Sequence, residues 1–253
     1  MQNDKIVNVL ISIVASFIVS FCVAVTLSGK SEQVSATNTN TNINVDKAIE
    51  DYLMNNPSII RKTLELAAQQ ERVEAEKRIA ENYKKHIDEL HNTDNSPFVG
   101  PKDAKITIVE FFDFNCGYCK RLAPTMMKII KANPDVRVIM KPVAFLAPSS
   151  QSAAKALLAA NAQGKFINLY EGLLTHNGQI TEDVIDEKIK ASGLDVAKTR
   201  ELMKSSDIEK KFGEITELSR NVEVSGVPTM IINGTPLRAY DQEQIQRVID
   251  SLK

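Results

Sequence analysis

The sequence predicts an α/β domain with a helical insertion, preceded by an N-terminal helical segment. Two apolar runs rich in β-branched and aromatic residues, at 106–112 and 136–140, are typical of buried strands. A helical stretch at about residues 148–222 separates them from a short strand at 230–232. Asn233-Gly234 follows this strand and predicts a hairpin turn. The order of strand, helix, strand, helical block, hairpin and final helix predicts one mixed sheet with helices around it.

The first 29 residues are typical of an export or anchoring element. Residues 6–27 form a run without charged side chains. This run is long enough to span a bilayer and is longer than a usual signal-peptide core. Val34-Ser35-Ala36 has the small-x-small pattern of a cleavage site, so a cleaved signal peptide and an uncleaved membrane anchor remain alternatives. Either one would place the rest of the chain in an oxidising compartment, the periplasm or the cell envelope.

A polar linker and two helices are predicted next. Residues 30–44 are rich in Ser, Thr, Asn and Gln and predict a flexible linker. Apolar residues then recur at helical spacing until Asn55-Asn56-Pro57, where a second, long helix begins and runs to about Leu90. Its narrow apolar stripe is typical of a helix–helix seam. We expect residues 45–95 to join copies of the chain into a homo-oligomer, a dimer in preference to a trimer; folding back on its own domain is the alternative.

The C-terminal domain, residues 97–253, has a start or stop signal for each helix. The helix that follows the first strand covers about 116–132 and ends at Asn133-Pro134. Helices at 152–163 and 166–175 open the insertion. The remaining helix starts are marked by residues that favour the first turn, namely Thr181, Asp195, Asp207 and, for the closing helix 242–252, Asp241.

Cys116 and Cys119 lie where the first predicted strand gives way to a helix. They are one helical turn apart, a separation that a disulfide can bridge. A cysteine at a helix N-terminus has its thiolate stabilised by free N–H groups and the helix dipole. Cys116 is therefore the predicted nucleophile, and the more shielded Cys119 is the predicted resolving thiol.

Other interpretations of this cysteine pair are weaker. A zinc site would need two more ligands, and His86, His91 and His176 offer no second pair at suitable spacing. A structural disulfide across two residues would constrain the unfolded chain very little. The net charge of -1, from 31 basic and 32 acidic residues, gives no support to nucleic-acid binding. We expect no metal, no nucleic acid and no cofactor beyond the redox-active pair.

Two motifs carry a resemblance to a known family. Residues 109–119, Val-Glu-Phe-Phe-Asp-Phe-Asn-Cys-Gly-Tyr-Cys, and Gly226-Val227-Pro228-Thr229 resemble the DsbA-like branch of the thioredoxin superfamily, the exported disulfide oxidoreductases of bacteria. The resemblance covers residues 97–253 and implies a thioredoxin fold with an inserted helical subdomain. Residues 45–90 are similar to the helical leader of oligomeric members. Gly-Tyr between the cysteines departs from the Pro-His of monomeric oxidases and is similar to the pair in dimeric isomerases.

The resemblance implies a substrate-binding role for the residues around the second motif. Pro228 is expected in the cis form beside the reactive sulfur, where it exposes the backbone of Val227 for pairing with a substrate strand. Thr229 and Tyr118 are expected to line the same surface. An ordinary turn entering a strand is the plainer alternative for this motif.

The resemblance also implies a proton relay beneath the cysteines. Glu110 lies on the predicted strand that leads to Cys116 and matches the buried acid that family members place there. The alternative is a carboxylate at a solvent-facing edge. Lys141, at the end of the next strand, is a candidate for its charge partner.

These features predict a thiol–disulfide oxidoreductase outside the cytoplasm, which reacts through mixed disulfides at Cys116. Its partners would be unfolded or misoxidised exported proteins and a membrane protein that restores its redox state. Isomerase or bifunctional activity is favoured over pure oxidation because of the Gly-Tyr pair and the oligomerisation helices. The alternative is a surface-anchored oligomeric binding protein or chaperone on a thioredoxin scaffold.

Overall fold

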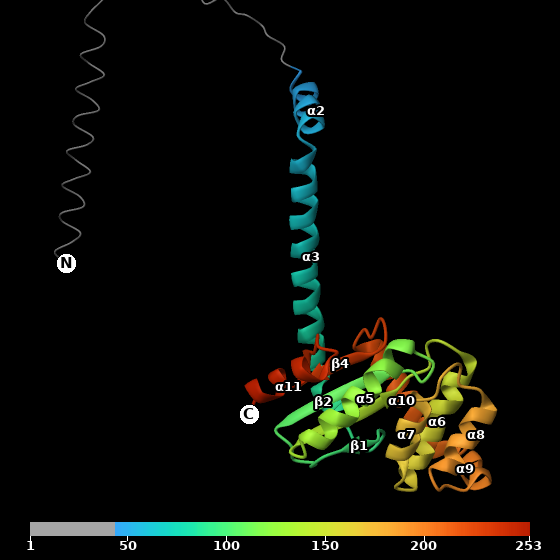
Figure 1. The fold of residues 1–253 in the computed structure, drawn as a ribbon. Coiled ribbons are helices and arrows are strands. Elements are labelled where there is room, and N and C mark those ends of the chain that lie inside the picture. The colour runs from blue at the N-terminus through green and yellow to red at the C-terminus, as the bar shows by residue number, and fades with distance from the viewer. Residues whose placement is uncertain (1–43) are drawn as a thin grey trace, which may run out of the picture. The chain divides into compact units, whose positions relative to one another are not determined.

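The computed structural model describes residues 44–253 (Figure 1). The predicted leader or anchor and nearly all of the predicted linker lie outside the described residues. The chain divides into two units, and the boundary in the sequence lies between Ile60 and Arg61. In the first unit, helix α2 (Val45–Asn55) is capped by the Asn44 side chain, which accepts a hydrogen bond from the Lys47 N–H at 3.1 Å.

Helix α2 has no buried residue, and its apolar side chains share one face. Val45, Ile49 and Tyr52 follow the i, i+4, i+7 spacing of a helical stripe and are 60%, 53% and 59% exposed. Helix α3 (Pro57–Lys85) begins with proline at its first position, as predicted. Helix α3 ends at Lys85, whereas the prediction extended it to about Leu90. A separate short helix, α4 (Ile87–Leu90), follows His86 and covers the remaining residues.

The second unit is built on a mixed sheet with the strand order β1-β3-β2-β4-β5. The central strand β2 is parallel to β3 and antiparallel to β4, and every residue of β2 is buried. The two-residue strand β1 was not predicted. The strands of the described residues are β1 (Phe98–Val99), β2 (Ile106–Phe112), β3 (Val136–Pro142), β4 (Thr229–Ile232) and β5 (Thr235–Pro236).

Alternate residues of β2 face different helices, since successive side chains of a strand point to opposite sides. Ile108 packs in a cluster with residues of α5 (Gly117–Ala132) and α11 (Gln242–Ser251). Val109 and Phe111 instead pack with residues of α10 (Ser206–Asn221). Tyr83 and Leu90 join this second cluster, so the ends of α3 and of α4 contribute to the core of the domain.

The predicted helical insertion is present between β3 and β4. Its helices gather at one end of the sheet (Figure 1) and comprise α6 (Pro148–Ala162), α7 (Phe166–Leu174), α8 (Glu182–Ala191), α9 (Val196–Met203) and α10. The predicted α/β fold with a helical insertion is therefore confirmed.

Two helix starts differ from the sequence predictions. Helix α6 begins at Pro148, because proline is tolerated in the first turn, whereas the prediction began at 152. Helix α10 is capped by the Ser205 side chain, so Asp207 is the second residue of that helix. The predicted cap Thr181 accepts a hydrogen bond from the N–H of the third residue after it, and so do Asp195 and Asp241.

Candidate active site

Cys116 is the N-cap residue of α5, directly after the loop that leaves β2. Its side chain accepts a hydrogen bond from the Cys119 N–H, with 3.4 Å between nitrogen and sulfur. The sulfur therefore lies at the positive end of the helix dipole, where an anion is stabilised. Both cysteines are buried, Cys116 with 5% of its surface exposed and Cys119 with none, so Cys119 is the more shielded residue, as predicted.

The proline loop before β4 lies against this sulfur. The Val227–Pro228 peptide is cis, as expected, and the Cys116 thiol donates to the Val227 carbonyl at 3.3 Å. Thr229 pairs with Phe111 across the sheet, and its hydroxyl donates to the Gly226 carbonyl at 2.7 Å. The pairing of β4 with β2 thus brings together two motifs that lie about 110 residues apart in the chain.

Glu110 is fully buried within the sheet, which rules out the alternative of a solvent-facing carboxylate. The Tyr170 hydroxyl on α7 donates to Glu110 Oε2 at 2.9 Å, and no partner among the described residues bonds to Oε1. Burial raises the pKa of Glu110 to about 7, against the opposing effect of the Tyr170 hydrogen bond.

The resolving thiol interacts electrostatically with this acid. Burial is the main cause that raises the pKa of Cys119, and the negative charges of Cys116 and Glu110 raise it further. Cys119 therefore stays protonated until a nearby group takes its proton. Glu110 is buried in the same region of the domain and can change its charge near neutral pH.

Lys141 does not pair with Glu110, so that prediction is wrong. In the sheet register Glu110 lies opposite Met140, and Lys141 lies opposite Phe111 on the other face. The Lys141 ammonium donates to Ser96 Oγ at 3.0 Å, and more distantly to the Asn92 carbonyl and to Asn95 Oδ1. Burial lowers the pKa of Lys141 to about 7.

Asp113, in the turn between β2 and Cys116, is a positioning residue that the sequence analysis did not identify. It is fully buried, and its backbone carbonyl accepts a hydrogen bond from the Cys116 N–H at 3.0 Å. Its carboxylate accepts four hydrogen bonds of 2.7 to 3.0 Å, from the N–H groups of Asn115, Phe145 and Leu146 and from the Ser150 hydroxyl. A charged residue directly after a strand whose residues are all buried was the available signal.

A groove of about 600 Å³ opens beside the reactive sulfur. Tyr118, Arg121 and Leu122 of α5 line one side, and residues 225–229 line the other. Tyr118 is 70% exposed, and the Arg121 guanidinium lies over its ring at 4.2 Å from the centroid. The groove therefore combines predicted substrate-binding residues with an arginine that the prediction did not include.

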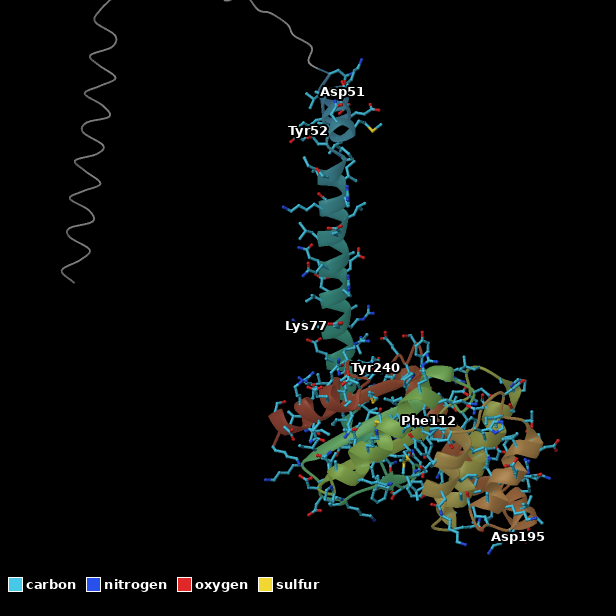
Figure 2. All side chains as sticks on the ribbon, viewed as in Figure 1. Asp51, Tyr52, Lys77, Phe112, Asp195 and Tyr240 are labelled. Carbon is cyan, nitrogen blue, oxygen red and sulfur yellow. The ribbon has the colours of Figure 1, made fainter. Side chains whose placement is uncertain are left out.

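The groove continues toward the loop before α11. Arg238 and Tyr240 of that loop also line it, and neither was predicted from the sequence. Tyr240 lies at the surface of the domain, whereas Phe112 lies inside it at the end of β2 (Figure 2). Arg121 lies far in the sequence from the loop that carries Arg238 and Tyr240, so only folding brings these side chains to one surface.

Comparison with known proteins identifies the family. A family model described as a DSBA-like thioredoxin domain matches residues 107–252. The catalytic domain of Proteus mirabilis ScsC is 31% identical, with a TM-score of 0.62, over 68% of this chain and 97% of that chain. The probable disulfide bond formation protein D of Bacillus cereus is 26% identical over 165 residues, 60% of this chain and 76% of that protein.

A third similarity covers a small part of a much longer protein. The Na(+)/H(+) antiporter NhaA 1 of Salinispora arenicola is 29% identical over 137 residues, which make up 53% of this chain. The match spans only 21% of the antiporter's length, so its transport activity does not carry over. The match of the family model to more than half of the chain, together with the cysteine and proline geometry described above, shows that this chain belongs to the DsbA-like thioredoxin family of thiol–disulfide oxidoreductases.

Proposed function

We propose that the protein forms and rearranges disulfide bonds in exported proteins through mixed disulfides at Cys116. One observation carries this proposal: the Cys116 sulfur caps helix α5 and lies 3.3 Å from the Val227 carbonyl of the cis-proline loop. The helix N-terminus favours the anion, and the backbone of the loop offers a docking edge for an extended substrate.

Oxidation of a substrate proceeds in two exchanges. A substrate thiolate attacks Cys116 Sγ in the Cys116–Cys119 disulfide, the bond to Cys119 breaks, and Cys119 leaves with the electron pair and takes up a proton. A second substrate thiolate then attacks the substrate sulfur of the mixed disulfide. The substrate disulfide forms, Cys116 leaves as a thiolate, and the cysteine pair has gained two electrons.

Isomerisation starts from the reduced pair and needs no net electron transfer. The Cys116 thiolate attacks a wrong substrate disulfide and releases one substrate thiolate, which then attacks another disulfide of the same substrate. Reformation of a correct bond expels the Cys116 thiolate. When the mixed disulfide persists, Cys119 gives its proton to Glu110 and attacks Cys116 Sγ, which releases the substrate in reduced form.

Two features support isomerase or bifunctional activity over pure oxidation. Tyr118 between the cysteines is turned outward and supplies no positive charge to the thiolate, whereas a histidine there would. The exposed apolar stripe of α2 suits pairing with a second copy of the chain, and we propose a homo-oligomer, preferably a dimer. A cleft between copies would hold misoxidised substrates.

We further propose that the protein acts in the periplasm or the cell envelope. The proposal rests on the uncharged residues 6–27, which lie outside the described residues. Within residues 44–253, no helix is both long and apolar enough to cross a membrane. Steady oxidation needs a partner that takes two electrons from the reduced pair, and a membrane-bound disulfide donor fits this role.

Two cysteine variants test the function. Cys116→Ser should abolish both the reduction of a model disulfide and the rescue of a scrambled substrate; unchanged rescue would favour the alternative binding protein. Cys119→Ser should accumulate covalent adducts with substrates, visible on non-reducing gels. The matched Cys116→Ser variant should accumulate none, and adducts on it would contradict the assigned order of attack.

A further inference from the structure

Two positively charged side chains line the groove beside the reactive cysteine, and the acids Glu76 and Glu223 lie near its Arg238 end. Arg121 and Arg238 line the groove described above, and no carboxylate of the described residues lines it. A second hollow of about 360 Å³ also borders α5. Its lining includes Lys120, Arg121 and His176 and contains no acid of the described residues. Arg121 thus borders both hollows.

The two arginines of the groove are available to a ligand. Within the described part of the chain, Arg121 forms no ion pair, and its guanidinium lies over the face of the Tyr118 ring. Arg238 forms a long ion pair with Glu76, at 4.0 Å, and the side chains of Arg238 and Glu76 are both more than half exposed. The chain as a whole has a net charge of -1, so this local excess of positive charge is not a property of the composition.

We propose that the groove selects cysteine-containing peptide segments with an aspartate or glutamate close to the cysteine. This inference rests on the proposed function, because it concerns the substrates of the same cysteine. A peptide bonded to Cys116 lies against Val227 and enters the groove beside it. Arginine pairs with carboxylates through two parallel hydrogen bonds, and the Tyr118 and Tyr240 rings suit an apolar neighbour of that acid.

The test compares two peptides that differ only in charge. Each has one cysteine bonded to thiopyridine, flanked by glutamates in one peptide and by lysines in the other. In the full-length Cys119→Ser variant, the Cys116 thiolate attacks the peptide sulfur, the bond to thiopyridine breaks, and thiopyridine leaves as a thiolate whose absorbance reports the rate. A small uncharged disulfide measures the intrinsic reactivity of Cys116.

The glutamate peptide is expected to react about tenfold faster than the lysine peptide at low salt, from two exposed charge pairs. Molar salt should reduce this ratio toward one. Taking the ratio for each variant cancels any change in thiolate reactivity. Arg121→Glu and Arg238→Glu should each lower the ratio at least threefold, whereas Arg247→Glu, an exposed arginine of α11 outside the groove, should keep it.

The outcomes separate this inference from the proposed function. A ratio near one in the parent, or an equal effect of Arg247→Glu, would overturn the selection of acidic segments while the reaction itself stands. Failure of the small disulfide and of both peptides to react at Cys116 would overturn the proposed function as well. Both groove arginines are exposed, so their substitution leaves the core packing intact.

Discussion

Replacing Glu110 by glutamine is expected to stabilise the folded protein at pH 8 and to leave its stability near pH 4.5 almost unchanged. The carboxyl group is fully buried, and burial raises its pKa from an ordinary value of 4.5 to about 7. A raised carboxyl pKa means that the folded state binds a proton more tightly than the unfolded state. Its contribution to stability is therefore complete below pH 4.5 and is lost as the pH rises to 7.

The size of the effect follows from the two pKa values. The difference between 4.5 and about 7, at about 1.4 kcal/mol per pH unit, corresponds to about 3 kcal/mol. Glutamine keeps the volume of the side chain and an oxygen that accepts a hydrogen bond from the Tyr170 hydroxyl, so the packing and this hydrogen bond are retained. Above pH 7 the variant should therefore be more stable by about 3 kcal/mol.

Urea unfolding followed by circular dichroism at pH 4.5, 6, 7 and 8 measures this difference. A reductant keeps both cysteines as thiols throughout. The exposed Glu171 of α7 supplies the control variant Glu171→Gln, which reports the effect of removing one surface charge. If the unfolding free energies of Glu110→Gln and the parent differ by the same amount at every pH in this range, the raised pKa of Glu110 is refuted.

Lys141, Asp113 and Ile49 can be tested by single substitutions in the same way. Burial lowers the pKa of Lys141 from 10.5 to about 7, so its contribution to stability is complete above pH 10.5 and is lost as the pH falls to 7. Over that range the parent should lose about 5 kcal/mol of unfolding free energy relative to Lys141→Met. An equal dependence of the unfolding free energy on pH in the two proteins would contradict this. Asp113→Asn should lower the free energy of unfolding by about 2–4 kcal/mol, because the asparagine amide cannot accept all the hydrogen bonds that the buried carboxylate accepts. The control is the same change at the exposed Asp207 of α10. An equal loss of stability in the two variants would refute the argument. Ile49→Glu on the exposed face of α2 should convert a proposed homo-oligomer to monomers in analytical ultracentrifugation, whereas an unchanged mass would exclude this face as the contact.

The local features of this protein were predictable from its sequence. The β-branched run at Ile106–Phe112 forms a strand because its side chains suit a surface that is buried on both faces. Thr181, Asp195 and Asp241 cap their helices because each side chain accepts a hydrogen bond from an N–H three residues later. Asn233 forms the hairpin because it tolerates positive φ, here 46°.

The contacts between distant segments were decided by the tertiary structure. The sequence placed Glu110 on one strand and Lys141 at the end of the next, but the register that β2 and β3 adopt turns the two side chains to opposite faces. The partner of Glu110 is Tyr170 on α7, 60 residues further along the chain. A cap or a turn is fixed by neighbours in the chain, whereas a partner across a sheet depends on register and on how the whole core packs.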